Sequence, residues 1–315
     1  MITIKRILCP IDLSSDSSSA LAPLAIELAH NYGAALQVCY CVEETATIGR
    51  VRKAQKELED TIKRALANRK GAVETYAIEW EALVFAGSHP AELITREAAR
   101  QDVDLIVMCS RRRPLRAALL GSTAERVYRT APCPVLITHP EMRQATGNSI
   151  ESFRFKRVLV AHDFSDYSEM ALKYAFSLAQ EHQAELHLLH VLDAPLLKEP
   201  ELSWSSATVE GSYHKAARSL QQAVSPETHL WCTVKTAVRW GKPYTETLSY
   251  CREQRIDLIC MGARGAGFGM HSLIGSNVDR VLRQSPCPVL VARPLSKTSF
   301  APIVSNLSDE KMMIL

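Results

Sequence analysis

The chain repeats itself at an offset of about 150 residues, and this duplication constrains the fold more than any other feature. Matching segments keep the same order in both halves. The clearest pairs are residues 6–16 with 157–166, 104–109 with 257–262, and 131–136 with 285–290. Because several separate segments match in register, the chain is a tandem duplication of one unit.

Each copy alternates apolar, strand-like runs with helical stretches in the order β-α-β-α-β-α-β-α-β. Runs such as residues 105–108 are continuously apolar, which is typical of strands buried on both faces in a parallel sheet. We therefore predict an α/β protein with two tandem, open, mostly parallel five-stranded sheets of Rossmann-like type, each with helices on both faces. The predicted divisions are a first domain at 1–140, a linker at 141–155, a second domain at 156–295 and a tail at 296–315.

Composition disfavours several classes of function. The net charge of +3 over 315 residues is too small for the strongly basic face that nucleic-acid binding needs. No apolar run approaches the roughly 18 residues that span a bilayer, and the first residues lack the apolar core of a signal peptide. We therefore expect a cytoplasmic protein that binds neither nucleic acid nor membranes.

Cysteine usage agrees with that expectation. The nine cysteines are odd in number and show no framework-like spacing. Cys39 and Cys41 alternate along a predicted strand, so their thiols would point to opposite faces of the sheet. We expect no metal site.

A glycine-rich segment follows the fourth predicted strand of the second copy. It contains Gly262 and Gly265, and it ends in Gly275 and Ser276 at the start of a predicted helix over 277–283. Loops at the carboxyl ends of parallel strands bind ligands in open α/β sheets, and a helix N-terminus favours an anion. We expect these glycines to adopt positive φ and to cradle a di- or triphosphate. The alternative is a flexible turn that only joins strand to helix.

Other phosphate-binding and catalytic motifs are absent from the sequence. There is no Gly-x-x-x-x-Gly-Lys-[Ser/Thr] loop and no Gly-x-Ser-x-Gly elbow. A dinucleotide fingerprint would follow the first strand of the copy, where the chain instead reads Asp163-Phe-Ser.

Asp163 ends the first predicted strand of the second copy and should face the same crevice as the glycines. Its carboxylate could accept hydrogen bonds from a ribose or an adenine amine; the alternative role is that of a helix N-cap. Asp166 lies nearer the helix, and we predict that it is the cap. Val191, near the end of the second strand, would offer an apolar surface to a base, or else belong to the core.

Taken together, these residues resemble the universal stress protein family in its tandem two-domain form. The family pattern Gly-x2-Gly-x9-Gly-[Ser/Thr] is met by Gly262, Gly265, Gly275 and Ser276. The resemblance implies binding of ATP or AMP, with or without Mg²⁺, and at most slow ATP hydrolysis. The implied site comprises Ala161, His162, Asp163, Val191, Met261, Gly262, Gly265, Gly275, Ser276 and Asn277.

The first copy departs from the family pattern. Cys109 and Arg112 stand where the first two glycines are expected, and eight residues rather than nine precede Gly121. A side chain forced into left-handed geometry costs roughly 1–2 kcal/mol, so we expect this copy to have lost ordinary ATP binding. Its arginines leave two alternatives. Their guanidinium groups bind an anion, or they form a basic loop that is only solvated. They are Arg111, Arg112, Arg113 and Arg116.

The resulting hypothesis is a cytosolic, adenine-nucleotide-binding stress or regulatory protein that binds mainly through its second domain. The two copies would pack as an intramolecular pseudo-dimer, with a homodimer and an unidentified protein partner as further options. Two other functions stay open. One is a protein-interaction module that binds no nucleotide, and the other is an ATP-using enzyme that forms adenylates.

Overall fold

The computed structural model describes residues 2–13, 18–68, 78–110, 120–139, 154–193, 206–265 and 275–295. Contacts among them divide the chain into two compact units. Among the described residues, the N-terminal unit holds residues 3–139 with 294–295, and the C-terminal unit holds residues 154–293 with residue 2. Almost all of the predicted linker and tail lies outside the described residues, so their limits stay a prediction.

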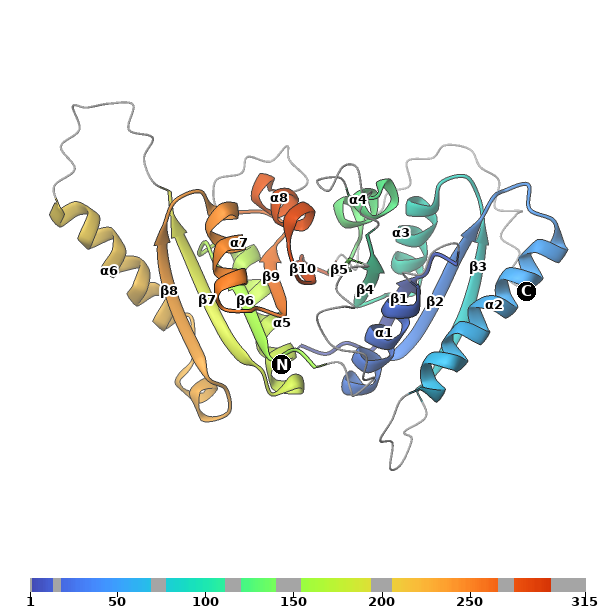
Figure 1. Cartoon of the computed structure of the whole chain (residues 1–315), viewed down its shortest axis with the longest axis horizontal. Coiled ribbons are helices and arrows are strands. Elements are labelled where there is room, and N and C mark those ends of the chain that lie inside the picture. Colours follow the sequence, from blue (N-terminus) through green and yellow to red (C-terminus); the bar gives the residue numbers. More distant parts are fainter. Residues whose placement is uncertain are drawn as a thin grey trace. The chain divides into compact units, whose positions relative to one another are not determined.

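The N-terminal unit alternates strands and helices as the sequence predicts (Figure 1). Its elements are β1 (Arg6–Pro10), α1 (Ser18–Tyr32), β2 (Ala35–Val42), α2 (Ile48–Ala67), β3 (Trp80–Ala86), α3 (Pro90–Arg100), β4 (Leu105–Cys109), α4 (Ser122–Thr130) and β5 (Val135–Thr138).

The C-terminal unit repeats this order and adds a short 3-10 helix before its third strand. Its elements are β6 (Arg157–Ala161), α5 (Asp166–His182), β7 (Glu185–Leu192), α6 (Ser206–Gln222), the 3-10 helix η2 (Pro226–Leu230), β8 (Val234–Trp240), α7 (Pro243–Glu253), β9 (Leu258–Gly262), α8 (Ser276–Gln284) and β10 (Val289–Ala292).

Within each unit the five strands pair in parallel. Their order is β3-β2-β1-β4-β5 in the N-terminal unit and β8-β7-β6-β9-β10 in the C-terminal unit. Right-handed crossovers then place α1 and α2 on one face and α3 and α4 on the other, and the members of each pair contact each other. The predicted α/β, Rossmann-like fold is confirmed. Each order reverses once, between β1 and β4 or between β6 and β9.

An aspartate fixes the two central strands of each unit at their amino ends. Asp257, just before β9, accepts backbone N–H groups of Lys156 and Arg157 through one oxygen, both at 2.9 Å. Asp104, just before β4, accepts the N–H groups of Lys5 and Arg6 in the same way, at 2.7 and 3.0 Å. The duplicated Asp therefore has a structural role, because it ties the entry of the first strand to the start of the fourth.

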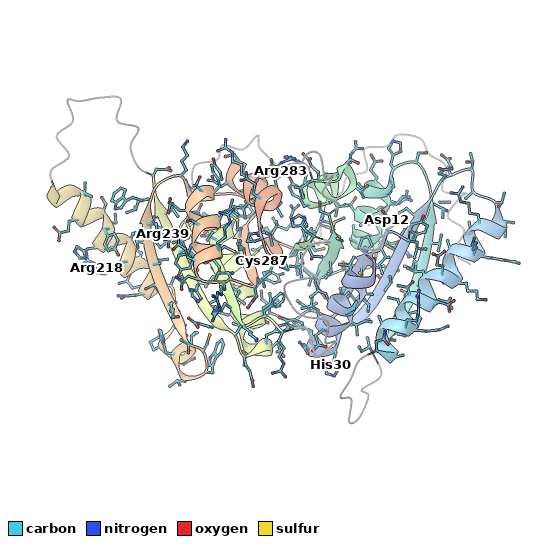
Figure 2. All side chains as sticks on the ribbon, in the orientation of Figure 1. Asp12, His30, Arg218, Arg239, Arg283 and Cys287 are labelled. Carbon is cyan, nitrogen blue, oxygen red and sulfur yellow. The ribbon has the colours of Figure 1, made fainter. Side chains whose placement is uncertain are left out.

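Side chains of the central strands fill the space between sheet and helices (Figure 2). The apolar runs 105–108 and 258–261 are buried along their whole length. This agrees with the reading of continuous apolar runs as strands covered on both faces.

None of the described helices is long and apolar enough to cross a lipid bilayer. Across the same residues, no cluster of three or more His, Cys, Asp or Glu side chains is placed to hold a metal ion.

His182, in the last turn of α5, is an unusual member of the core because it is only 3% exposed. Its ring stands edge-on to Phe155, with 4.9 Å between the ring centroids. Among the described residues, neither ring nitrogen has a hydrogen-bond partner. Burial, assisted by the charge of Arg154, lowers the pKa of His182 to about 4. The imidazole is therefore neutral in the native protein at neutral pH.

We predict that His182 makes the C-terminal unit sensitive to acid. Below the ordinary histidine pKa, the unfolded chain binds a proton that the native His182 refuses. The free energy of unfolding therefore falls by up to about 3 kcal/mol as the pH drops from 7 to 4. Denaturant unfolding of the wild type and of His182→Leu at pH 7 and pH 5 measures this, and the variant should lose less stability over that interval. Equal losses in the two proteins would contradict the assignment.

Candidate functional site

The predicted site residues gather at the carboxyl ends of β6, β7 and β9, where the strand order of the C-terminal unit reverses. Ala161, the last residue of β6, pairs with Met261, the penultimate residue of β9. Asp163 follows β6 by two residues, and Gly262 ends β9. Such a switch point is where open α/β sheets form their ligand crevice.

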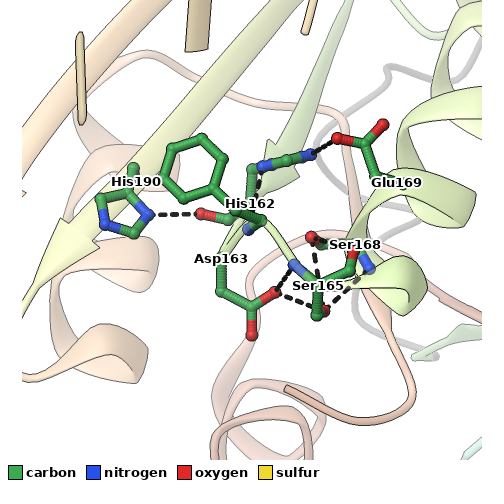
Figure 3. Close-up of polar contacts among 7 residues, drawn as sticks. His162, Asp163, Ser165, Ser168, Glu169 and His190 are labelled. Carbon is green, nitrogen blue, oxygen red and sulfur yellow. Dashed lines mark hydrogen bonds and ion pairs between the residues drawn. The ribbon is translucent and has the colours of Figure 1, made fainter. Parts of the chain in front are cut away.

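Asp163 is held in a tight turn between β6 and α5 (Figure 3). One carboxylate oxygen, Oδ1, accepts the backbone N–H of Ser165 at 3.1 Å and the Ser165 hydroxyl at 2.5 Å. The residue between them, Phe164, adopts a φ of 63°. These features describe an Asx turn, in which a carboxylate bonds the backbone two residues ahead. The carboxylate is thus fixed in place by its own loop.

Ser165, not Asp166, caps helix α5, so the predicted cap is wrong. The Ser165 hydroxyl oxygen accepts the N–H of Ser168 at 3.2 Å. Asp166 is the first residue of the helix itself, where its negative charge is favourable beside the helix N-terminus. Asp163 does not cap the helix through these bonds, since they end at Ser165.

His162 lies between these groups and is 2% exposed. Its Nδ1 accepts the backbone N–H of Phe164 at 3.2 Å, and its Nε2 lies 3.2 Å from Oε1 of Glu169. Burial lowers the pKa of His162, although the carboxylates of Glu169 and Asp163 oppose this effect. Because Nδ1 accepts the Phe164 N–H, a neutral ring carries its proton on Nε2, the nitrogen beside Glu169.

The His162 ring points toward Glu169, while the Asp163 carboxylate points the other way (Figure 3). His190, on β7, donates its Nδ1–H to the backbone carbonyl of His162 at 2.7 Å. The ring of Phe164 lies 4.6 Å from that of His190, between centroids. His162 therefore belongs to the support of the turn. Val191, the next residue on β7, is partly exposed rather than fully buried.

Gly262 is required by packing. A Cβ added there would lie 2.6 Å from the backbone carbonyl carbon of Tyr167 and 2.7 Å from its oxygen, in the first turn of α5. The expected positive φ at Gly262 and Gly265 is wrong, because the positive-φ glycines of the described residues are Gly33 and Gly241. The absence of a side chain, rather than a left-handed backbone, is what position 262 needs.

Gly265 lets the loop approach the acidic turn. A Cβ at this position would lie 2.6 Å from Oδ2 of Asp163, the carboxylate oxygen that does not bond Ser165. Gly262 thus faces helix α5, and Gly265 faces the Asp163 carboxylate, which is predicted to bind the ligand. Arg264, between them, lies over the ring of Tyr167, with its guanidinium carbon 5.8 Å from the centroid.

The N-terminus of α8 completes the site. Gly275 is the N-cap with an ordinary φ of −69° and donates its N–H to the carbonyl of Ala263 at 3.0 Å. A glycine cap has no side chain with which to bond the first helical N–H groups, which belong to Ser276 and Asn277. These groups are the type of donor that holds an anion at a helix start.

The loop between these two parts, residues 266–274, lies outside the described residues, as does the arginine-rich loop 111–119 of the N-terminal unit. The latter includes Arg112, so the predicted anion grip is untested. In the N-terminal unit, Cys109 ends β4 at the position of Gly262 and is absent from the described positive-φ residues. The predicted left-handed penalty therefore does not apply to Cys109.

Sequence reasoning missed Tyr167 and Glu169, which support the site from helix α5. A contact between the backbone of Tyr167 and Gly262 joins segments almost a hundred residues apart and depends on how closely helix and sheet pack. In the sequence, the one sign of this contact is Gly262 itself. Glu169 carried no signal, because an exposed glutamate in a first helical turn is common.

Comparisons with known proteins identify the family. The model of the Universal stress protein family matches residues 3–139 and again residues 154–293. These matches span most of the sequence, and the chain belongs to this family.

Two relatives each match slightly less than half of the chain. Universal stress protein YxiE of Bacillus subtilis is 32% identical over 152 residues, which cover 44% of this chain and 99% of the relative. A universal stress protein of Methanocaldococcus jannaschii is 29% identical over 145 residues, covering 45% of this chain and 85% of the relative. The crystal structure of a universal stress protein from Archaeoglobus fulgidus matches both units, with a TM-score of 0.64 at 23% identity. It covers 93% of this chain and 99% of its own, which shows the shared fold.

We predict that Gly262→Ala destabilises the C-terminal unit even without ligand. The new methyl group must push β9 and α5 apart, which costs about 1–3 kcal/mol. Thermal unfolding should show a lower Tm than the wild type. Gly211→Ala in α6 is the matched control, because a Cβ there meets nothing within 4 Å. Its Tm should stay equal or rise slightly. Equal Tm values for wild type and Gly262→Ala would contradict the packing role.

Proposed function

We propose that the C-terminal unit binds an adenine nucleotide, ATP or AMP, with or without Mg²⁺. The observation that carries this proposal is the approach of Gly265 to the Asp163 carboxylate at the switch point of the sheet. The glycine-capped start of α8 supplies amide donors that suit phosphate. Family membership and the intact glycine pattern support the same ligand.

In this proposal the two ends of the nucleotide meet different chemistry. The base and ribose lie near Asp163, whose Oδ2 faces the loop, and near the partly exposed Val191. The phosphates lie along the loop from Gly262 to Gly275 and at the amides of Ser276 and Asn277. Ala161, His162 and Met261 contribute through the strand ends that hold Asp163 and the loop in place.

We propose a binding protein rather than an efficient enzyme. The titratable groups beside the turn already have structural tasks. Asp163 Oδ1 holds Ser165, and His162 bridges Phe164 and Glu169. Turnover would be at most slow ATP hydrolysis. In the N-terminal unit Cys109 replaces the glycine that packs against the first helix, so one nucleotide per chain is expected.

The proposed role is regulatory, in the stress response and in the cytoplasm. Nucleotide occupancy would alter the choice of a protein partner. The duplication supports a pseudo-dimer of the two units within one chain, with a homodimer of whole chains as the other arrangement.

Calorimetric titration of the full chain with ATP and with AMP tests the binding proposal, and mass spectrometry of the freshly purified protein tests for bound nucleotide. We expect one site per chain. Asp163→Asn keeps the size of the side chain and should weaken binding at least about tenfold, because a charge-assisted hydrogen bond is lost. Gly265→Val should weaken binding by a similar factor or more.

Gly211→Val is the control and should bind as the wild type does, because this glycine lies in α6 with open space around it. Thermal unfolding without nucleotide separates loss of binding from loss of fold. Absence of binding by the wild type, or unchanged affinity in both Asp163→Asn and Gly265→Val, would overturn the proposal. The first result would favour a protein-interaction module.

A further inference from the structure

Two cysteines of the C-terminal unit meet in its interior, at a distance from the candidate site. Cys251 lies near the end of α7. Cys287, labelled in Figure 2, lies in the connection from α8 to β10. Their Sγ atoms are 3.4 Å apart. The two residues are 1% and 5% exposed. Neither cysteine belongs to the candidate site.

The surroundings fix the backbone of Cys287 and place a carbonyl beside the Cys251 thiol. The Ser285 hydroxyl donates to the carbonyl of Cys287 at 2.6 Å and accepts the N–H of Cys287 at 3.2 Å. The Cys251 thiol faces the carbonyl of Ile256 at 4.0 Å. A disulfide needs the sulfur atoms about 2.05 Å apart, so they must approach by about 1.3 Å. This is a small movement for a residue in a loop between two elements.

The repeat adds an internal comparison. Cys133 of the N-terminal unit corresponds to Cys287, but Ala98 of α3 occupies the place of Cys251. Ala98 is itself buried. The fold therefore accepts alanine at this point of the helix, and the second thiol is an addition found in one copy.

We propose that Cys251 and Cys287 are an oxidation site that forms an intramolecular disulfide with hydrogen peroxide. In the first step one thiolate attacks the peroxide, which gives a sulfenic acid and hydroxide. In the second step the neighbouring thiol displaces the sulfenic oxygen as water, and the S–S bond forms. Two thiols are oxidised by two electrons, and one peroxide is reduced to two waters.

Close placement of the second thiol directs the outcome of the first step. A sulfenic acid formed on either sulfur meets the other thiol before a second peroxide arrives. The disulfide therefore forms in preference to sulfinic acid. Burial and the neighbouring Cys251 raise the pKa of the Cys287 thiol, so the reaction is slow at neutral pH. Its rate should rise about tenfold per pH unit, because thiolate is the reacting form.

The bond would close the segment 251–287, which contains β9, the glycine loop and α8. Oxidation would thus tie together the two ends of the segment that carries the candidate phosphate loop. A covalent closure of this length is expected to raise the Tm of the unit by about 5 °C or more. The site stands on the geometry of the thiols alone and does not depend on nucleotide binding.

The test uses the full chain, reduced and then exposed to hydrogen peroxide at pH 7 and pH 8.5. The protein is then denatured and labelled with a maleimide. Its intact mass gives the number of thiols that remain. We expect two of the nine thiols to be lost and the unlabelled protein to become 2 Da lighter. The loss should be faster at the higher pH. Peptide mapping should find Cys251 linked to Cys287 by a bond that a reductant cleaves.

Cys251→Ala, the residue found in the other copy, should fold normally and abolish this product. Cys232→Ala is the matched control: Cys232 is a buried cysteine of the same unit whose thiol donates to the carbonyl of Ala184, and its removal should leave the product intact. Either of two results would overturn the proposal. One is full maleimide labelling of Cys251 and Cys287 after other cysteines have been oxidised. The other is their conversion to separate sulfinic or sulfonic acids.

Discussion

The parallel pairing of β6 with β9 is the constraint on which the rest of the C-terminal unit depends. These two strands are far apart in the sequence, and Asp257 joins them at their amino ends through two backbone N–H groups. Because the strands start in register, they also end together, which brings the turn of Asp163 beside Gly262 and Gly265. The candidate site is thus a consequence of strand order rather than of the loop alone.

The glycine pattern combines two requirements that look alike in a sequence. Gly262 leaves room for the backbone of helix α5, whereas Gly265 leaves room for a carboxylate oxygen. Loss of the first glycine changes how closely helix and sheet approach, and loss of the second changes what the crevice can hold. Cys109 in the other unit shows that the scaffold forms with a side chain at the first position.

The sequence was sufficient to predict the duplication, the alternation of strands and helices along each copy, and the gathering of Asp163 with the glycines, because these follow from repeats and buried apolar runs. It did not predict that Ser165 would cap α5, since Asp166 and Ser165 are both good caps and local geometry chooses between them. The meeting of Cys251 with Cys287 was also invisible, because it depends on how α7 packs beside the β10 connection. Contacts between distant segments need coordinates.

The turn after β6 has a consequence for the thermodynamics of recognition. Phe164 holds a φ that most side chains avoid, and the turn around it is maintained by backbone hydrogen bonds that Asp163 Oδ1 and His162 Nδ1 accept. Folding itself therefore removes the conformational freedom of the Asp163 carboxylate. A molecule arriving at this end of the sheet meets a group that has little entropy left to lose, so each contact contributes nearly its full strength to affinity.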